Sequence, residues 1–117
     1  MQTRQIPESE WPAFFNSFNS RHRGWVMNLE VFGPDIGAQV EGSWLVLEGV
    51  TAEYDERRGN TIMIMAGDRP ADHLTHSIRR ATEISLEKTD SGEDATLSIE
   101  AADGNRTLLS FAYEVLS

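Results

Sequence analysis

The chain of 117 residues contains no cysteine. This absence excludes a disulfide scaffold, thiolate metal ligands and thiol catalysis. Proteins of reducing compartments fit this composition, so we expect a cytoplasmic protein. Long apolar runs are missing as well: no segment approaches the roughly 20 apolar residues that a membrane-spanning helix needs, and the opening residues show no apolar stretch suited to a signal peptide. We therefore expect no membrane partner.

Basic residues are few, with 10 Lys and Arg against 19 Asp and Glu, which gives a formal net charge of −9. Proteins that bind nucleic acids gain affinity from Lys and Arg side chains that neutralise phosphates. We therefore expect no nucleic-acid partner. The acidity has two alternative meanings, high solubility or an acidic docking surface, and composition does not separate them.

Sequence signatures of catalysis and of cofactor binding are also missing. There is no Gly-x-Ser-x-Gly elbow for a nucleophilic serine, and the glycines never form a phosphate-binding loop that leads into a helix. Carboxylates are numerous but lie in no catalytic pattern; Glu53, Asp55 and Glu56, for example, crowd one polar turn. The sequence therefore indicates no catalytic residue and no cofactor, and it gives no support for an enzyme.

An aromatic stripe predicts a helix at about residues 9–22. Its apolar positions have the i, i+3, i+4, i+7 spacing of one helical face, and they are Trp11, Phe14, Phe15 and Phe18. Ser9 is a candidate N-cap, and Gly24 is a good terminator. We expect this face to pack on a sheet; the alternative is an aromatic binding groove.

After residue 24 the apolar period changes from 3.6 to 2, which predicts antiparallel strands over about residues 24–113. In the long predicted strand at 44–54, Gly49 indicates a bulge or a bend. The expected fold class is α+β in a single domain, residues 1–117: an N-terminal helix followed by a strongly bent antiparallel sheet or a small barrel of 5–7 strands. Its element order resembles that of Sm-like or SH3-like barrels.

Asp72, His73 and His76 are the best candidates for a metal site. Two imidazoles and a carboxylate suit a divalent metal when no thiolate is present. The two histidines, however, are three residues apart, and a strand would send them to opposite faces. The alternative is that they are hydrogen-bonding residues at the junction of a loop and a strand.

The loop at residues 32–37 is a possible binding loop. Proline and two glycines indicate an irregular backbone there, and functional residues often lie on such loops. The candidate binding residues are Phe32, Pro34, Asp35 and Ile36. A plain connecting turn is the alternative reading.

Three stretches resemble a bacterial family of short single-domain proteins of unknown function. They are an Ile-Pro-x-x-x-Trp-Pro start at residues 6–12, a Gly-Pro-Asp-Ile-Gly-Ala-Gln loop at 33–39, and a His-x-x-His-x-Ile stretch at 73–78. The resemblance implies a bacterial protein that consists of one domain. It implies no activity and no catalytic residue.

Two functional hypotheses follow. The first is a non-enzymatic binding or assembly module that forms a homodimer or a higher oligomer, or that binds another protein, because Thr61–Met65 is apolar on both faces and an exposed apolar face calls for a partner. The interface is expected on strands and not on the helix. The second hypothesis is a small-ligand or metal site around Asp72, His73 and His76.

Overall fold

The computed structural model describes residues 2–67 and 69–112. In these residues the chain forms one α-helix, two short 3-10 helices and eight strands. Their order is β1 (Gln2–Ile6), η1 (Glu8–Glu10), α1 (Trp11–His22), β2 (Val26–Gly33), β3 (Gly37–Asp55), β4 (Gly59–Ala66), η2 (Pro70–Asp72), β5 (Leu74–Arg79), β6 (Ala81–Lys88), β7 (Asp94–Ala101) and β8 (Arg106–Phe111).

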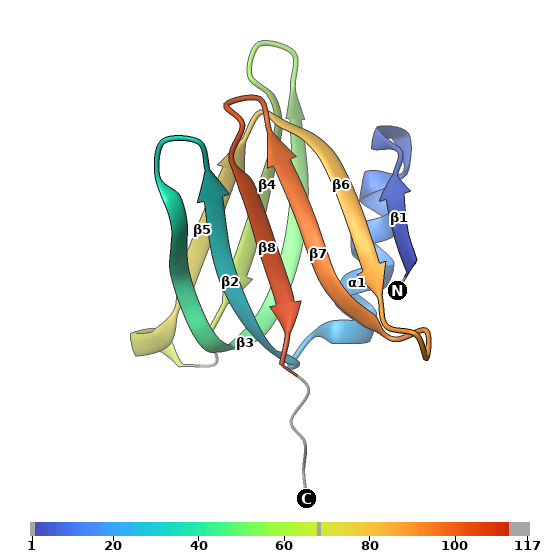
Figure 1. Cartoon of the computed structure of the whole chain (residues 1–117), viewed down its shortest axis with the longest axis vertical. Coiled ribbons are helices and arrows are strands. Elements are labelled where there is room, and N and C mark those ends of the chain that lie inside the picture. Colours follow the sequence, from blue (N-terminus) through green and yellow to red (C-terminus); the bar gives the residue numbers. More distant parts are fainter. Residues whose placement is uncertain (1, 68, 113–117) are drawn as a thin grey trace, which may run out of the picture.

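All eight strands belong to one antiparallel sheet with the order β1-β6-β7-β8-β2-β3-β4-β5. The sheet folds into two layers, with β4 packed against β6 and β5 against β7. β1, β6, β7, β8, β2 and the first half of β3 form the front layer in Figure 1. The expected combination of a helix and an antiparallel sheet is confirmed. Of the two expected forms, a bent sheet or a small barrel, the open order of the strands excludes the barrel.

Strand β3 carries the chain from the front layer to the back layer. Gly37–Val46 pairs with β2, whereas Leu47–Asp55 pairs with β4. The β2–β3 register shifts twice opposite Met27–Glu30, so β3 contains extra residues there, which bend and twist a strand. Trp44 adopts φ 55 at this bend, and its N–H donates to Asn28 Oδ1 at 2.8 Å. The bulge expected at Gly49 is confirmed by the register shift between Leu47 and Gly49.

Helix α1 closes one side of the space between the two layers (Figure 1). Trp11, Phe15 and Phe18 are buried, as their spacing predicts, while Phe14 is half-buried against the core. The helix starts two residues later than predicted, because residues 8–10 form a 3-10 turn. The prediction of Ser9 as N-cap is wrong: Glu10 holds that position and makes no side-chain capping bond.

Asn19 of α1 binds the edge of β3 through both ends of its amide. Its Nδ2 donates to the Val50 carbonyl at 2.9 Å, and its Oδ1 accepts from the Val50 N–H at 2.8 Å. An open strand edge carries unpaired backbone groups, and a covering element satisfies them. The helix therefore seals the second half of β3 with a side chain that replaces a neighbouring strand.

Two further predictions need correction. Strand β1 precedes the helix, and of its residues only Ile6 is buried, so its polar sequence gave no apolar signal. The helix therefore does not come first, and the resemblance to Sm-like or SH3-like barrels loses its basis. With β1, the described residues form eight strands where 5–7 were expected. The predicted strand limit at residue 113 lies outside the described residues.

Candidate functional site: a groove between two hairpins

The predicted binding loop is the turn of the β2–β3 hairpin, which joins residue 33 to residue 37. Pro34, Asp35 and Ile36 are exposed at its tip. Phe32 is half-buried at the end of β2 that leads into the turn. The β7–β8 hairpin runs beside it, because Phe32 pairs with Arg106 of β8. The two turns therefore lie together at the same end of the front layer (Figure 1).

A groove of about 560 Å³ lies between the two hairpins. Its walls are formed by apolar side chains from both hairpins and by the ion pair between Glu100 of β7 and Arg106 of β8. The lining side chains are Phe32, Pro34, Glu100, Ala101, Arg106 and Leu108. Such a mixture of apolar walls and a few charged groups is typical of binding sites.

Two glycines allow the hairpins to lie this close. A Cβ placed on Gly33 would lie 2.0 Å from Asn105 Oδ1 and 3.1 Å from Ile36 Cγ1. Gly104 adopts φ 89 in the β7–β8 turn, where a side chain would be strained, and it faces Pro34. A side chain at position 33 would therefore displace the side chain of Asn105 from the space between the two turns.

The apolar surface continues from the groove onto the edge of the front layer. Val40 of β3 pairs with Glu30, which in turn pairs with Leu108. The exposed fraction is 65% for Val40 and 40% for Ile36. We use the name hairpin patch for the apolar side chains of the groove and of the adjoining β2–β3 hairpin: Phe32, Pro34, Ile36, Ala38, Val40 and Leu108.

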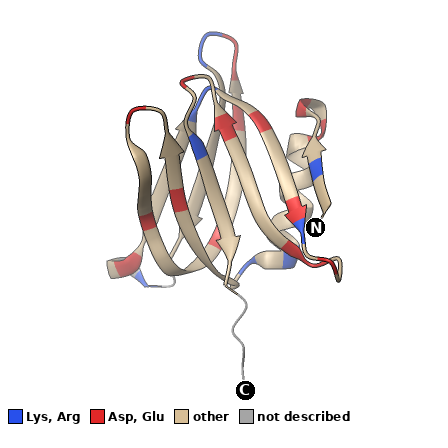
Figure 2. Ribbon diagram, viewed as in Figure 1, with Lys and Arg blue, Asp and Glu red and all other residues tan. Residues whose placement is uncertain are grey.

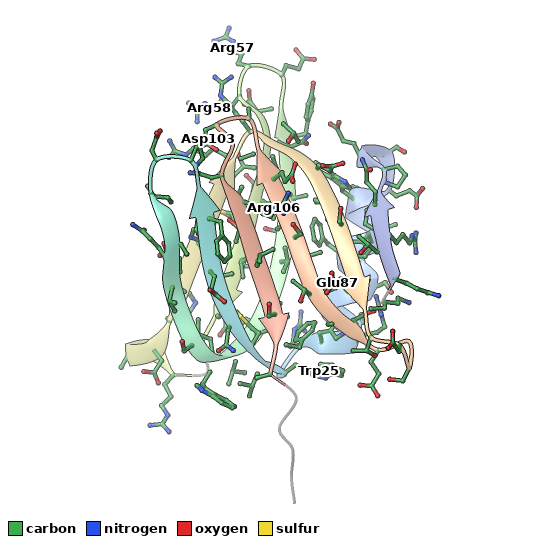
Figure 3. The ribbon with its side chains drawn as sticks, viewed as in Figure 1. Trp25, Arg57, Arg58, Glu87, Asp103 and Arg106 are labelled. Carbon is green, nitrogen blue, oxygen red and sulfur yellow. The ribbon has the colours of Figure 1, made fainter. Side chains whose placement is uncertain are left out.

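Both signs of charge border the hairpin patch. Arg106 Nε donates to Glu100 Oε1 at 3.1 Å, and this hydrogen bond is the main cause that holds the pKa of Glu100 below its usual value. Glu30 lies within the patch, between Val40 and Leu108. Figure 2 shows red and blue ribbon on neighbouring strands of this face, and Figure 3 places Arg106 on its front.

The metal candidates do not converge. Asp72 ends η2, and His73 is exposed with its Nε2 3.4 Å from Glu48 Oε2. His76 is half-buried on β5 opposite Ile64, where burial lowers its pKa while Glu41 raises it. Within residues 2–67 and 69–112, no group of three or more His, Asp or Glu side chains is arranged to hold a metal ion. The structure therefore lends the metal hypothesis no support.

A buried histidine–aspartate pair lies at the C-terminal end of α1. His22 Nε2 is 3.1 Å from Asp94 Oδ2, and both side chains are 3% exposed. Arg21 and Lys88 also contact the Asp94 carboxylate, at 2.5 Å and 3.9 Å. Three aromatic rings, Phe18, Trp25 and Phe111, surround the imidazole, with centroid distances of 4.5–4.6 Å.

This pair is built for structure and not for proton transfer to a ligand. His22 Nδ1 lies 2.9 Å from the Phe18 carbonyl, so both ring nitrogens face protein oxygens. Burial lowers the pKa of His22, against the Phe18 carbonyl and Asp94, which raise it. A general base must reach the proton that it removes, and neither nitrogen is open to a ligand. The pair fastens the end of α1 to the start of β7.

Sequence reasoning missed this pair because its members are 72 positions apart in the chain and neither lies in a motif. Asp94 carries one weak signal, a charged residue directly before the alternating apolar residues of β7.

Among the described residues, none of the helices has the length and the apolar character that a membrane-spanning helix requires.

Comparison with known proteins agrees with the expected family resemblance. A family described as "Family of unknown function (DUF5335)" matches residues 2–115. A protein of Aquifex aeolicus (strain VF5), described as "Uncharacterized protein", is 28% identical over 109 residues, which cover 93% of this chain and 91% of the relative. No solved structure matches the chain.

Proposed function

We propose that this chain, which belongs to the DUF5335 family of unknown function, is a non-enzymatic assembly module that forms a homodimer through the hairpin patch. The observation that carries the proposal is the exposed apolar surface of the first half of β3. Val40 is 65% and Trp44 62% exposed, whereas Leu47 and Val50 of the same strand are fully buried. Exposed apolar surface next to a groove is typical of protein-binding sites.

The open edge of the first half of β3 also favours an interface at the hairpin patch. Among the described residues, Gly37–Leu45 pairs with β2 on one side, and no strand pairs with its other side. No lysine, arginine or proline, the usual guards of an open edge, lies in this segment. The bulges near Trp44 shorten the regular edge, so side-chain contacts of the hairpin patch would contribute more than a long backbone ladder.

A second copy of the chain is the partner that fits this surface best. A two-fold interface joins the same surface of both subunits, so it must be complementary to itself. The hairpin patch meets this condition because Glu30 and Glu100 lie near Arg106, which allows an arginine of one subunit to face a carboxylate of the other. A uniformly acidic surface, in contrast, would repel its own copy.

Met63 and Met65 offer less exposed apolar surface for a dimer interface than their sequence pattern suggested. They lie half-buried on the outer face of the back layer, whereas Ile62 and Ile64 fill the core. Leu108 lies on the front layer, so the apolar residues outside the core are divided between two faces. We therefore assign the interface to the front face, where Leu108 lines the groove and Val40 is exposed on the neighbouring edge strand.

Light scattering coupled to size exclusion at tens of micromolar tests the proposal. We expect twice the monomer mass of 13.1 kDa. Val40→Lys should convert the dimer to a monomer without loss of folded structure, because it places two like charges at the interface. The substitution also reduces the net negative charge, so general repulsion between subunits cannot explain the loss.

Tyr54→Lys is the matched control, since Tyr54 is 68% exposed on the second half of the same strand. It should remain a dimer. A wild-type mass of 13.1 kDa at these concentrations would overturn the proposal, and dissociation of the Tyr54→Lys variant would show that the interface lies elsewhere.

Two expectations from composition accompany the proposal. With its net charge of −9, the protein should not bind short single-stranded RNA or DNA with submicromolar affinity at about 150 mM salt. Fluorescence anisotropy measures this directly. The absence of cysteine further supports a cytoplasmic location.

A further inference from the structure

We propose that the outer face of the back layer contains a binding site for a small molecule that carries a phosphate group. The site is a cavity of about 680 Å³ where β3 and β5 end and β4 begins. Three arginines from two separate segments line it: Arg58 from the β3–β4 turn, and Arg79 and Arg80 from the corner between β5 and β6. The cavity is on a different layer from the hairpin patch, so the two proposals are independent.

The topology brings these arginines together. β4 pairs with β5 so that Thr61 lies opposite Arg79, and Thr61 follows the β3–β4 turn closely. The backbone N–H groups of Arg57 and Arg58 both donate to Asp55 Oδ1, at 2.8 Å and 3.1 Å, which holds the turn in place. In Figure 2 the ribbon is blue at this turn and again where β5 leads into β6, at the same end of the molecule.

The three guanidinium groups have no carboxylate partner within ion-pair distance in the described part of the chain. Arg4, Arg21 and Arg106, in contrast, each pair with an acid. An unpaired cluster of like charge is unfavourable, and in a chain of net charge −9 it is unexpected. A bound anion would remove this repulsion.

The chemistry of the lining groups favours phosphate. Guanidinium groups bind phosphate oxygens through two parallel hydrogen bonds, and the hydroxyls of Thr61 and Ser77 add neutral donors on the same wall. Met63 offers an apolar floor for the rest of the molecule. Arg80 holds φ 55, a left-handed conformation that is uncommon for a residue with a side chain.

Two carboxylates also line the cavity, and they oppose an anion. Asp55 is engaged by the two backbone N–H groups of the turn. Glu53 lies across β4 from Arg79, since both residues pair with Thr61. Because strands are about 4.8 Å apart, Glu53 and Arg79 are separated by two strand spacings. Removal of the Glu53 charge should therefore strengthen phosphate binding.

Titration of the ¹⁵N-labelled protein with inorganic phosphate, at constant ionic strength and pH 7.5, tests the site by NMR. We expect saturable shifts at the amides of Ser77 and Arg79 and at the guanidinium groups. Arg79→Gln and Arg58→Gln should each weaken binding about tenfold, as the loss of a charge-assisted hydrogen bond predicts. Glu53→Gln should tighten it.

Arg57→Gln is the matched control. Arg57 is next to Arg58 in the same turn but does not line the cavity, and Figure 3 shows it at the tip of the turn. This variant should change affinity by no more than about twofold, the effect of a distant screened charge. Unfolding curves of all variants should coincide with that of the wild type.

Three results would overturn the proposal: no saturation with phosphate, an equal loss in Arg57→Gln and Arg58→Gln, or unchanged affinity in Glu53→Gln. Titration with citrate separates the ligand classes. Saturation with citrate but not with phosphate would contradict a phosphate site, whereas tighter binding of phosphate would support it.

Discussion

The two halves of strand β3 share one backbone but have different neighbours. The second half is sealed: Asn19 binds its edge, and Leu47 and Val50 are fully buried. The first half is open: residues 37–41 are exposed, and the bend near Trp44 separates them from the core. The comparison shows that a strand acquires its role from the element that covers its edge and not from its own β propensity.

Each half also has its own histidine, which is buried at His22 and half-buried at His76. His22 lies where the helix ends against the sealed half, since the Gly24 N–H donates to the Leu47 carbonyl at 2.8 Å. His76 lies on the side of the open half, where Glu41 raises its pKa against the effect of burial. Burial therefore affects both histidines in the same direction, although only His22 is fully enclosed.

Removal of the helical cover should have the largest effect. Phe18 is completely buried at the centre of the aromatic face, so Phe18→Ala should lower the free energy of unfolding by about 3–5 kcal/mol. Urea denaturation followed by circular dichroism measures the change. A variant that melts within a couple of degrees of the wild type would mean that the helix is peripheral to the core.

Asn19→Ala should have the next largest effect. It removes both hydrogen bonds to Val50 and leaves backbone groups of a buried residue unpaired, which costs about 1–3 kcal/mol. Asn16→Ala is the control, because Asn16 is exposed on the same helix. Equal stabilities of the two variants would show that the amide of Asn19 does not seal the strand.

Acidification should weaken the fold. His22 and His76 both have a pKa below their ordinary value of 6.5 in the folded chain, mainly through burial. The unfolded chain then binds more protons, so the free energy of unfolding is highest above about pH 6.5 and falls as the pH drops toward the folded pKa values. Asp94 raises the pKa of His22 and so brings it closer to the ordinary value, which narrows the pH range over which His22 affects stability.

Denaturation curves at pH 7.5, 6.5 and 5.5 measure this dependence. His76→Gln should make it shallower, because glutamine does not titrate. Stability that rises between pH 7.5 and 5.5 would contradict the assigned direction of both pKa shifts.

The smallest effect is expected on the open half. Val40→Ala should change the free energy of unfolding by no more than about 0.5 kcal/mol when measured at concentrations where the chain is a monomer, as for other exposed positions. A loss above 1 kcal/mol under these conditions would mean that Val40 contributes to the core. At concentrations where the wild type is a dimer, the same variant should dissociate more readily. The two measurements separate the contribution of Val40 to folding from its contribution to dimerisation.

Local patterns predicted the elements well where side chains report on a nearby face. The helical spacing of Trp11, Phe15 and Phe18 identified the buried face of α1, and the period of two after residue 24 indicated the antiparallel strands. The same approach missed β1, because an edge strand with polar side chains on both faces carries no apolar period. It also placed Ser9 at the helix start, where a 3-10 turn formed instead.

The sequence by itself determined the helix and its aromatic face, the period-two strands, the acidity and the absence of cysteine, because these depend on composition or on residues within a few positions of each other. The tertiary structure alone decided that the sheet stays open, that Asn19 seals half of β3, that His22 meets Asp94, and that Arg58 lies beside Arg79 and Arg80. These contacts join segments far apart in the chain, so they follow from strand order and register, which local spacing does not encode.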